Sequence, residues 1–250
     1  MMPLRTVRRD APWQWLRAGW NDFRMAPGVC LAYGAIFVAI GALFVFGLVA
    51  VGMSSTIPVA LSGFALVGPA LAVGIYQVSR AFEKGEIPRF RVIISRFPQR
   101  IAQIGFLSIL LGLLLMIWMR VAQILLVVLA PFAPLEPSAF LNFLFTDGSG
   151  LTLLAVGTVF GGVLATLSFA ISVIAFPLLV DRDVDAITAL ATSFNAVLKQ
   201  PFVMFTWAWL IAFIIGAGIA VFGVGLAVAF PWIALATWHA YRDFMPKEEG

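Results

Sequence analysis

The sequence predicts an all-α membrane protein whose six transmembrane helices form three hairpins, each preceded by a cytoplasmic amphipathic surface helix. Hydrophobic residues make up 62% of the 250 residues, and the mean hydropathy is +1.03. All but one of the 16 Lys and Arg residues lie outside the long apolar stretches of the chain. Charge-free apolar runs long enough to cross a bilayer core of about 30 Å are typical of polytopic membrane proteins.

Dividing these runs into helices of about 20 residues gives the six crossings. The first run, Met25–Ser79, is too long for one helix and contains a Met-Ser-Ser-Thr-Ile-Pro segment at residues 53–58, where we expect a break. The last run, Gln200–Tyr241, also crosses twice, with a turn expected at Gly223-Val224-Gly225. The first four predicted helices cover approximately Gly28–Val51, Val59–Phe82, Ile101–Ala130 and Leu151–Val180.

The distribution of positive charge predicts the orientation. Basic residues gather before the first predicted helix and after the second, fourth and sixth, whereas the loops on the other side carry only Glu136 and Asp147 as charges. The positive-inside rule therefore places both termini on the cytoplasmic side of the membrane. The first apolar run has full spanning length, so we expect an uncleaved first helix. The net charge of +4 favours contact with anionic membrane lipids over nucleic acid.

Three short amphipathic segments precede the first, third and fifth predicted crossings, and each is expected to lie in the cytoplasmic interface with its apolar face toward lipid. A proline follows each segment and is expected to mark the bend into the membrane, because proline disfavours helical geometry in the residue before it. The first apolar stripe is Trp13, Leu16, Trp20 and Phe23, and Pro27 follows it. The second is Phe90, Ile93, Ile94 and Phe97, followed by Pro98. The third is Ile187, Leu190, Ala191, Phe194, Val197 and Leu198, followed by Pro201.

The second helix of each predicted hairpin also contains a proline, at Pro69, Pro177 and Pro231, where we expect helix kinks. In the first and last copies an arginine follows 11 residues after the proline, and an aromatic residue, Tyr76 or Trp238, follows after seven. We interpret the chain as one integral membrane domain, 1–250, with pseudo-repeats at about 11–86, 87–183 and 184–246. Such repeats occur in transporters, and they can equally be duplicated structural modules.

Arg120 is the only charge within a predicted spanning helix, which makes it a candidate for contact with a partner or ligand. Its distance from Ile101 is about 28 Å along a helix, near the far face of the bilayer. The structural alternative is that Arg120 extends toward the interface or pairs with Glu136 or Asp147.

His239 is the only histidine, and a single imidazole cannot supply two axial ligands to a haem. It follows Trp238 at the cytoplasmic end of the last helix, where we expect an interfacial aromatic belt. The acidic stretch Asp181–Asp185 lacks the glycine and the glutamate of a calcium loop, so Asp183 or Asp185 is expected to cap the third surface helix. The sequence gives no catalytic, metal-binding or cofactor-binding motif, and we expect no cofactor and no enzymatic activity.

Three segments, Ala18–Phe23, Val67–Arg80 and Phe176–Asp185, resemble a family of predicted bacterial integral membrane proteins of unknown function. The resemblance extends over nearly the whole chain and implies a single unit in a Gram-negative bacterium. Some members carry a cytochrome c oxidase subunit label, which implies an association with a respiratory complex. The resemblance identifies no functional residue.

The apolar bundle predicts an accessory or scaffold subunit of a larger inner-membrane complex, such as a respiratory or photosynthetic one, with other integral membrane subunits as partners. Small residues such as Gly161, Gly162 and those between Gly216 and Gly225 would allow close helix packing. A small-molecule transporter or a lipid-handling protein is the alternative, and it predicts a cavity near the prolines of the kinked helices. A quinone, carotenoid or lipid in an apolar groove is compatible with either function.

Overall fold

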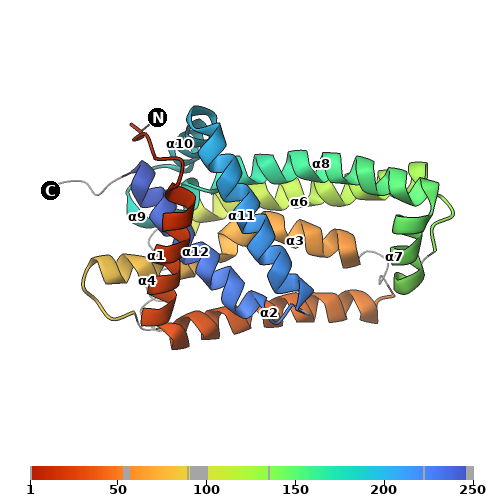
Figure 1. Cartoon of the computed structure of the whole chain (residues 1–250), viewed down its shortest axis with the longest axis horizontal. Helices are drawn as coiled ribbons and strands as arrows, with labels where there is room; N and C mark the ends of the chain where they lie inside the picture. Colours follow the sequence, from red (N-terminus) through yellow and green to blue (C-terminus); the bar gives the residue numbers. More distant parts are fainter. Residues whose placement is uncertain are drawn as a thin grey trace. The chain divides into compact units, whose positions relative to one another are not determined.

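A computed structural model describes residues 2–52, 57–88, 90, 101–134, 136–221 and 223–245, and within them it contains helices and connections without a strand (Figure 1). The second predicted amphipathic segment and Pro98 lie outside these residues, as do residues 53–56 of the expected break. The helices are α1 Ala11–Met25, α2 Pro27–Ala50, α3 Ile57–Leu71, α4 Val73–Glu83, α6 Ile101–Leu129, α7 Pro137–Thr146, α8 Gly148–Ser172, α9 Ala175–Asp181, α10 Ala186–Lys199, α11 Pro201–Ala220 and α12 Leu226–Phe244.

Four helical stretches in the described residues are long and apolar enough to span a membrane: α2, α6, the run Gly148–Asp181, and α11. The second predicted crossing is divided into α3 and α4, which have 15 and 11 residues and are each too short to span alone. The last predicted crossing, α12, has 19 residues, but its last turn contains the charged pair Arg242-Asp243. Six crossings therefore remain a prediction, whereas a multi-pass, all-helical membrane protein agrees with the structure.

The helical chain divides into two units, and the boundaries fall inside helices. Unit 1 comprises Met1–Ala39, Pro69–Ser108 and Phe169–Gly250, and unit 2 comprises Ile40–Gly68 and Ile109–Ser168. These boundaries do not coincide with those of the predicted pseudo-repeats, so the repeat remains a prediction.

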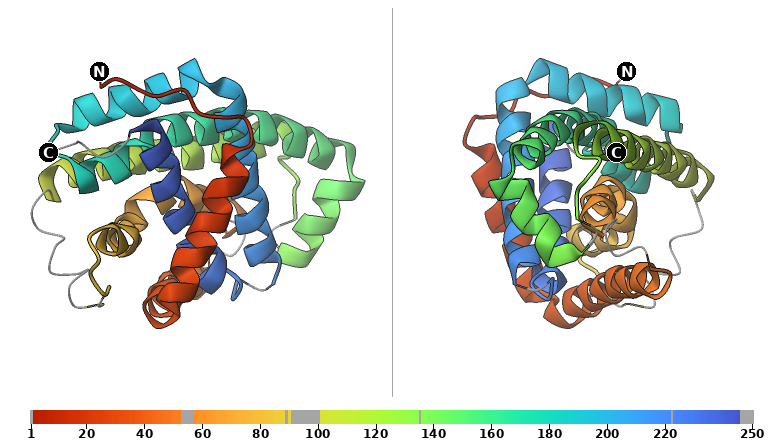
Figure 2. Two further views of the ribbon diagram at one scale, coloured as in Figure 1. Left: turned by 60° about the vertical axis from the view of Figure 1, so that its left-hand side comes forward. Right: turned by 90° about the vertical axis from the view of Figure 1, so that its right-hand side faces the viewer.

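In unit 1, α1 lies against α12 (Figures 1 and 2). The close approach depends on Gly19, because a Cβ at this position would come within 2.5 Å of the Ala236 backbone nitrogen. Around this crossing α1 buries Trp15 and Phe23, and the Trp15 ring meets the Trp207 ring of α11 edge-on at 5.4 Å. Aromatic pairs in this geometry are favourable beyond the area that they bury.

A second close approach joins α2 to α12 at Gly34. A Cβ at Gly34 would lie 2.0 Å from the carbonyl oxygen of Ala227. Pro231 lies four residues after Ala227 and has no backbone N–H, so it cannot donate the usual helical hydrogen bond to that carbonyl. The glycine thus allows the backbone of α2 to approach the carbonyl that Pro231 leaves open, and Phe37 and Phe230 stack beside it at 3.8 Å.

The three expected proline kinks have different outcomes. Pro69 lies at the end of α3, and the helix is interrupted after it at Ala72. Pro177 lies in α9, and the interruption comes before it, at residues 173–174, where Ser193 Oγ accepts the Ile174 N–H at 3.1 Å. Pro231 lies within α12, which continues through it.

Unit 2 consists of parts of α2, α3, α6 and α8 together with α7, and α6 and α8 run side by side (Figure 2). Trp118 of α6 joins three of these helices. Its indole N–H donates to the Val59 carbonyl of α3 at 3.0 Å, and Cβ atoms added at Gly63 or Gly161 would meet its ring at 3.1 Å. Of the predicted packing glycines, Gly161 therefore packs against the Trp118 ring, whereas Gly162 has open space beside it.

The predicted surface segments at the N-terminus and after α9 both form helices, α1 and α10, whose apolar stripes were expected to face lipid. In α1, Leu16 and Phe23 are buried as part of the stripe, while Trp13 is 53% exposed and the unpredicted Trp15 is buried. In α10 the stripe residues Ile187, Phe194 and Leu198 are exposed, which agrees with a face turned outward, and Leu190 and Val197 are half-buried. The small residues Ala186, Ala189, Ser193 and Ala196 are buried against the protein. The larger side chains of α10 thus remain available to a membrane surface.

Pro27 and Pro201 begin α2 and α11, as expected for bends into spanning helices. The expected turn near Gly223 is also present between α11 and α12, and Gly223 has a φ of +75°, which a glycine adopts readily.

Candidate functional site

Five charged residues of unit 1 gather where the C-terminal ends of α4, α9 and α12 meet. We call this group the Asp181 cluster; it consists of Arg80, Glu83, Asp181, Arg182 and Arg242. Each of the three helix segments lies at or beyond one of the prolines that the sequence predicts as kinks. The segments that end the second, fourth and sixth predicted crossings are therefore joined at one point.

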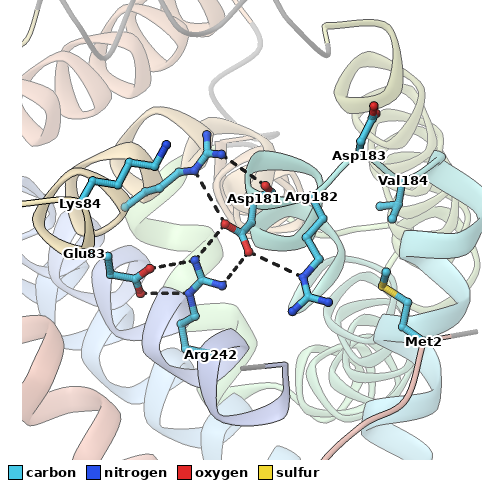
Figure 3. Close-up of a pocket in the computed structure, with 9 residues that line it drawn as sticks. Met2, Glu83, Lys84, Asp181, Arg182, Asp183, Val184 and Arg242 are labelled. Carbon is cyan, nitrogen blue, oxygen red and sulfur yellow. Dashed lines mark hydrogen bonds and ion pairs between the residues drawn. The ribbon is translucent and has the colours of Figure 1, made fainter. Parts of the chain in front are cut away.

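Arg242 is shared by two carboxylates (Figure 3). Its Nε and Nη2 donate to the two oxygens of Glu83 at 2.9 and 2.8 Å. Its Nη1 and Nη2 also donate to the two oxygens of Asp181 at 2.6 and 2.8 Å. Burial alone would lower the pKa of Arg242, but the hydrogen bonds to Glu83 and Asp181 and their negative charges raise it. Paired bidentate contacts of this kind are among the strongest polar contacts in proteins.

Two further arginines surround Asp181 at longer range. Arg80 Nε lies 3.7 Å from Asp181 Oδ1, and Arg80 Nη2 donates to the Asp181 main-chain carbonyl at 3.2 Å. Arg182 Nε lies 3.8 Å from Asp181 Oδ2. The cluster thus contains three guanidinium groups and two carboxylates.

Two aromatic residues of α12 donate further hydrogen bonds to Asp181 and Glu83. Tyr241 donates its hydroxyl to Asp181 Oδ2 at 2.6 Å, and Trp238 donates its indole N–H to Glu83 Oε1 at 2.9 Å. Both rings are fully buried, so they do not form the interfacial belt expected from the sequence. The reason is that the carboxylates of α4 and α9 provide acceptors for their polar tips inside the protein. Tyr76 of α4 is also buried and stacks on Trp238 at 6.4 Å.

A hollow of about 480 Å³ opens beside the cluster (Figure 3). It is lined by Met2, Arg80, Glu83, Lys84, Asp181, Arg182, Asp183, Val184 and Arg242. Glu83 and Asp181, which line its inner side, already accept hydrogen bonds from Arg242. They are therefore poor candidates for proton transfer, and their contacts hold the helix ends together. Among the described residues, no group of three or more His, Cys, Asp or Glu side chains is arranged to hold a metal ion.

A separate polar group connects α1, α4 and α12. Asp22 is buried, and its Oδ2 accepts the Ser79 hydroxyl at 2.5 Å and lies 2.9 Å from His239 Nε2. Asp22 stands between the serine and the histidine, so the histidine is not placed to take a proton from the hydroxyl as in a catalytic triad. The arrangement instead links α1 to α4 and α12 within unit 1.

With this geometry in view, comparison with protein-family models gives one match. The family of predicted integral membrane proteins DUF2189 matches residues 56–181, about half of the chain. The chain belongs to this family. No curated protein and no solved structure matches it. The DUF2189 match agrees with the resemblance seen in the sequence and includes Arg80, Glu83 and Asp181, while Arg242 lies beyond its end.

The predicted candidates in this DUF2189 protein fall into separate places. Tyr76 and Trp238 lie next to the Asp181 cluster, and His239 contacts Asp22. Arg120 belongs to unit 2, is exposed, and donates to Gln123 at 3.2 Å. The acids proposed as its alternative partners cap helices instead: Glu136 accepts N–H groups at the start of α7, and Asp147 does so at the start of α8.

The sequence prediction missed the acids that bring these helices together. Glu83 was not considered there, and Asp181 appeared only in the acidic stretch Asp181–Asp185, although the matching proline-to-arginine spacing of Arg80 and Arg242 was a usable signal. Equivalent arginines at the ends of two helices require an acidic partner if they are buried, and Asp181 fills that role. The expected cap of α10 is present, because Asp185 accepts the Thr188 N–H at 2.8 Å.

Proposed function

We propose that this chain is a non-enzymatic accessory or scaffold subunit of a larger bacterial inner-membrane complex, such as a respiratory or photosynthetic one. In this proposal both termini lie in the cytoplasm, and other integral membrane subunits cover part of its apolar surface. The distribution of basic residues along the sequence supports the orientation.

The observation that carries the proposal is an uncovered aromatic face on α11. Phe205, Trp209 and Phe213 follow one another at four-residue spacing and are 73%, 55% and 62% exposed. Trp209 and Phe213 stack at 5.4 Å and form a continuous aromatic stripe. Helices that associate in lipid depend on packing contacts, and a continuous stripe of large aromatic rings offers a wide surface for a partner helix to pack against.

Other spanning helices also leave much of their surface uncovered. Only 17% of the most apolar window of α2 and 22% of that of α6 is buried, compared with 67% for the run Gly148–Asp181. These faces are available to lipid and to partner helices. The charged groups of the Asp181 cluster support a structural role as well, because their hydrogen bonds are used to join helix ends.

Native purification tests the proposal directly. A tagged chain, extracted from its own membranes in mild detergent, is expected to elute with other integral subunits in fixed stoichiometry, measured by mass spectrometry and by the visible absorption of haem or pigment. The double substitution Trp209→Leu, Phe213→Leu is expected to release the partners while retaining an apolar surface. Phe46→Leu, at a 71% exposed phenylalanine of α2 in unit 2, serves as the matched control. A colourless peak that contains this chain and lipid alone would contradict the proposal.

The hollow beside the Asp181 cluster favours a second candidate, a small-molecule transporter or lipid-handling protein. The sequence-based form of this hypothesis expects a cavity near the prolines, whereas the hollow lies at the helix ends beyond them. Reconstitution of the pure chain into vesicles, followed by measurement of lipid exchange or solute uptake, separates this candidate from a scaffold.

A further inference from the structure

The hollow beside the Asp181 cluster has an excess of positive charge. Four of its lining residues are cationic and three are acidic: Arg80, Lys84, Arg182 and Arg242 against Glu83, Asp181 and Asp183. The two innermost acids are occupied by the contacts already described, while Asp183 is exposed and its carboxylate points away from the cluster (Figure 3). An additional anion would stabilise cations that are held partly out of water.

Two of the cations retain capacity for such an anion. Lys84 is exposed at the end of α4, and its ammonium group makes no hydrogen bond or ion pair with the residues that the structure describes. The Nε–H of Arg80 is buried and has no hydrogen-bond acceptor, because Asp181 Oδ1 is 3.7 Å away. A buried donor without an acceptor is unfavourable, and an anion placed beside it would supply the missing acceptor.

We propose that this hollow binds a phosphate group, with Lys84 and Arg80 as its cationic contacts and the Arg242 pairs as a rigid floor. The volume of about 480 Å³ is within the usual range for small-ligand sites. The hollow lies where α4, α9 and α12 end, and α10, with its exposed apolar side chains, follows directly. In a membrane this is the level of the headgroups, so an anionic phospholipid is one source of the phosphate, and a soluble phosphate compound is the other. The site is independent of whether the chain has partner subunits.

A titration with the purified full-length chain tests this site. Short-chain phosphatidylglycerol, phosphatidylcholine of the same chain length and inorganic phosphate are added separately in mild detergent, and the melting temperature gives an apparent Kd for each. Phosphatidylglycerol is expected to stabilise the wild-type chain saturably and more strongly than phosphatidylcholine. Lys84→Gln is expected to weaken phosphatidylglycerol binding about fivefold, since one basic residue near a membrane surface contributes about 1 kcal/mol.

Lys199→Gln is the matched control, because Lys199 is also an exposed lysine at a helix end but does not line the hollow. Equal weakening by the two variants would show binding to surface charge in general and would overturn the proposal. Saturable binding of inorganic phosphate that Lys84→Gln weakens and Lys199→Gln does not would support the site and identify a soluble ligand as its source. No saturable stabilisation by any of the three compounds would also overturn it.

Discussion

Different kinds of interaction stabilise the interiors of the two units of this DUF2189 protein. Unit 1 buries Trp15, Trp207, Trp238 and Tyr241 together with a network of ion pairs, and its helices approach closely at glycines. Unit 2 is made almost wholly of apolar helices, and its described interhelical polar contacts include the Trp118 indole to Val59 and the Ser168 hydroxyl to the Leu66 carbonyl. Many of its large side chains are exposed, as Leu43 and Val127 illustrate.

This contrast follows from the solvent. In a bilayer an exposed leucine has surroundings as apolar as a protein core, so hydrophobic burial does little to bring helices together. Polar contacts and close packing then provide the specificity. Unit 1 has many of both at the helix ends, whereas unit 2 presents long apolar faces that lipid or a partner can cover. The following experiments compare matched positions in the two units.

The largest difference is expected at arginine. Arg242→Gln should lower the free energy of unfolding by about 3–5 kcal/mol, because Glu83 and Asp181 would remain largely buried without their shared cation. Arg120→Gln in unit 2 should change it by less than about 0.5 kcal/mol, since that side chain is exposed. Denaturation in detergent, followed by tryptophan fluorescence, measures both. Equal effects would show that the Asp181 cluster does not stabilise unit 1.

Two glycines of the same helix provide the next comparison. Gly34→Ala should destabilise the protein by about 1–3 kcal/mol, because the new Cβ would clash with the Ala227 carbonyl and force α2 away from α12. Gly41→Ala has open space around it in unit 2 and should be neutral or stabilising by up to about 1 kcal/mol. The melting temperatures of the two variants test this order, and a larger loss for Gly41→Ala would exclude the proposed close approach.

A tryptophan tests whether unit 2 depends on its own polar contact. Trp118→Phe keeps an aromatic ring beside Gly63 and Gly161 but removes the hydrogen bond to Val59, so a loss of about 1 kcal/mol is expected. Trp209→Phe, at an exposed position of unit 1, should have little effect on the isolated chain. If Trp118→Phe proved equally silent, apolar packing alone would be sufficient to hold unit 2.

The smallest effect is expected at the surface of unit 1. Asp185→Ala should lower the melting temperature slightly by removing the cap of α10. The hydroxyl and N–H of Thr188 lower the pKa of Asp185 below its ordinary value of 3.8. Because the pKa is lower in the folded chain, the cap stabilises the protein above about pH 4 and loses this effect as the pH falls through the lowered pKa. The difference between wild type and variant, measured by denaturation from pH 7 to pH 3, should therefore shrink on acidification. A constant difference would argue against an ionised cap.

The sequence predicted the elements whose causes are local. Apolar runs located α2, α6, α8 and α11 because a bilayer requires that length of uncharged helix. Pro27, Pro201 and Gly223 marked helix starts and a turn through their own backbone preferences. Asp185 was a recognisable cap for the same reason, since its partner is only three residues away.

The sequence did not indicate that Leu16 and Phe23 of α1 face the protein, because a stripe of apolar residues fits a face toward lipid and a face toward the protein equally well. It likewise did not show that α3 and α4 are separate helices. The family resemblance was correct, and it identified membrane residence without identifying a site.

What the sequence determined by itself is therefore the membrane class, the approximate spans and the local caps, each governed by composition or by residues close together in the chain. The tertiary structure alone decided that Arg242 meets Glu83 and Asp181, and that Asp22 meets His239. These partners are separated by 159, 61 and 217 residues. A charge at the end of an apolar run indicates only that the run has ended; its partner depends on which other helix ends reach the same place.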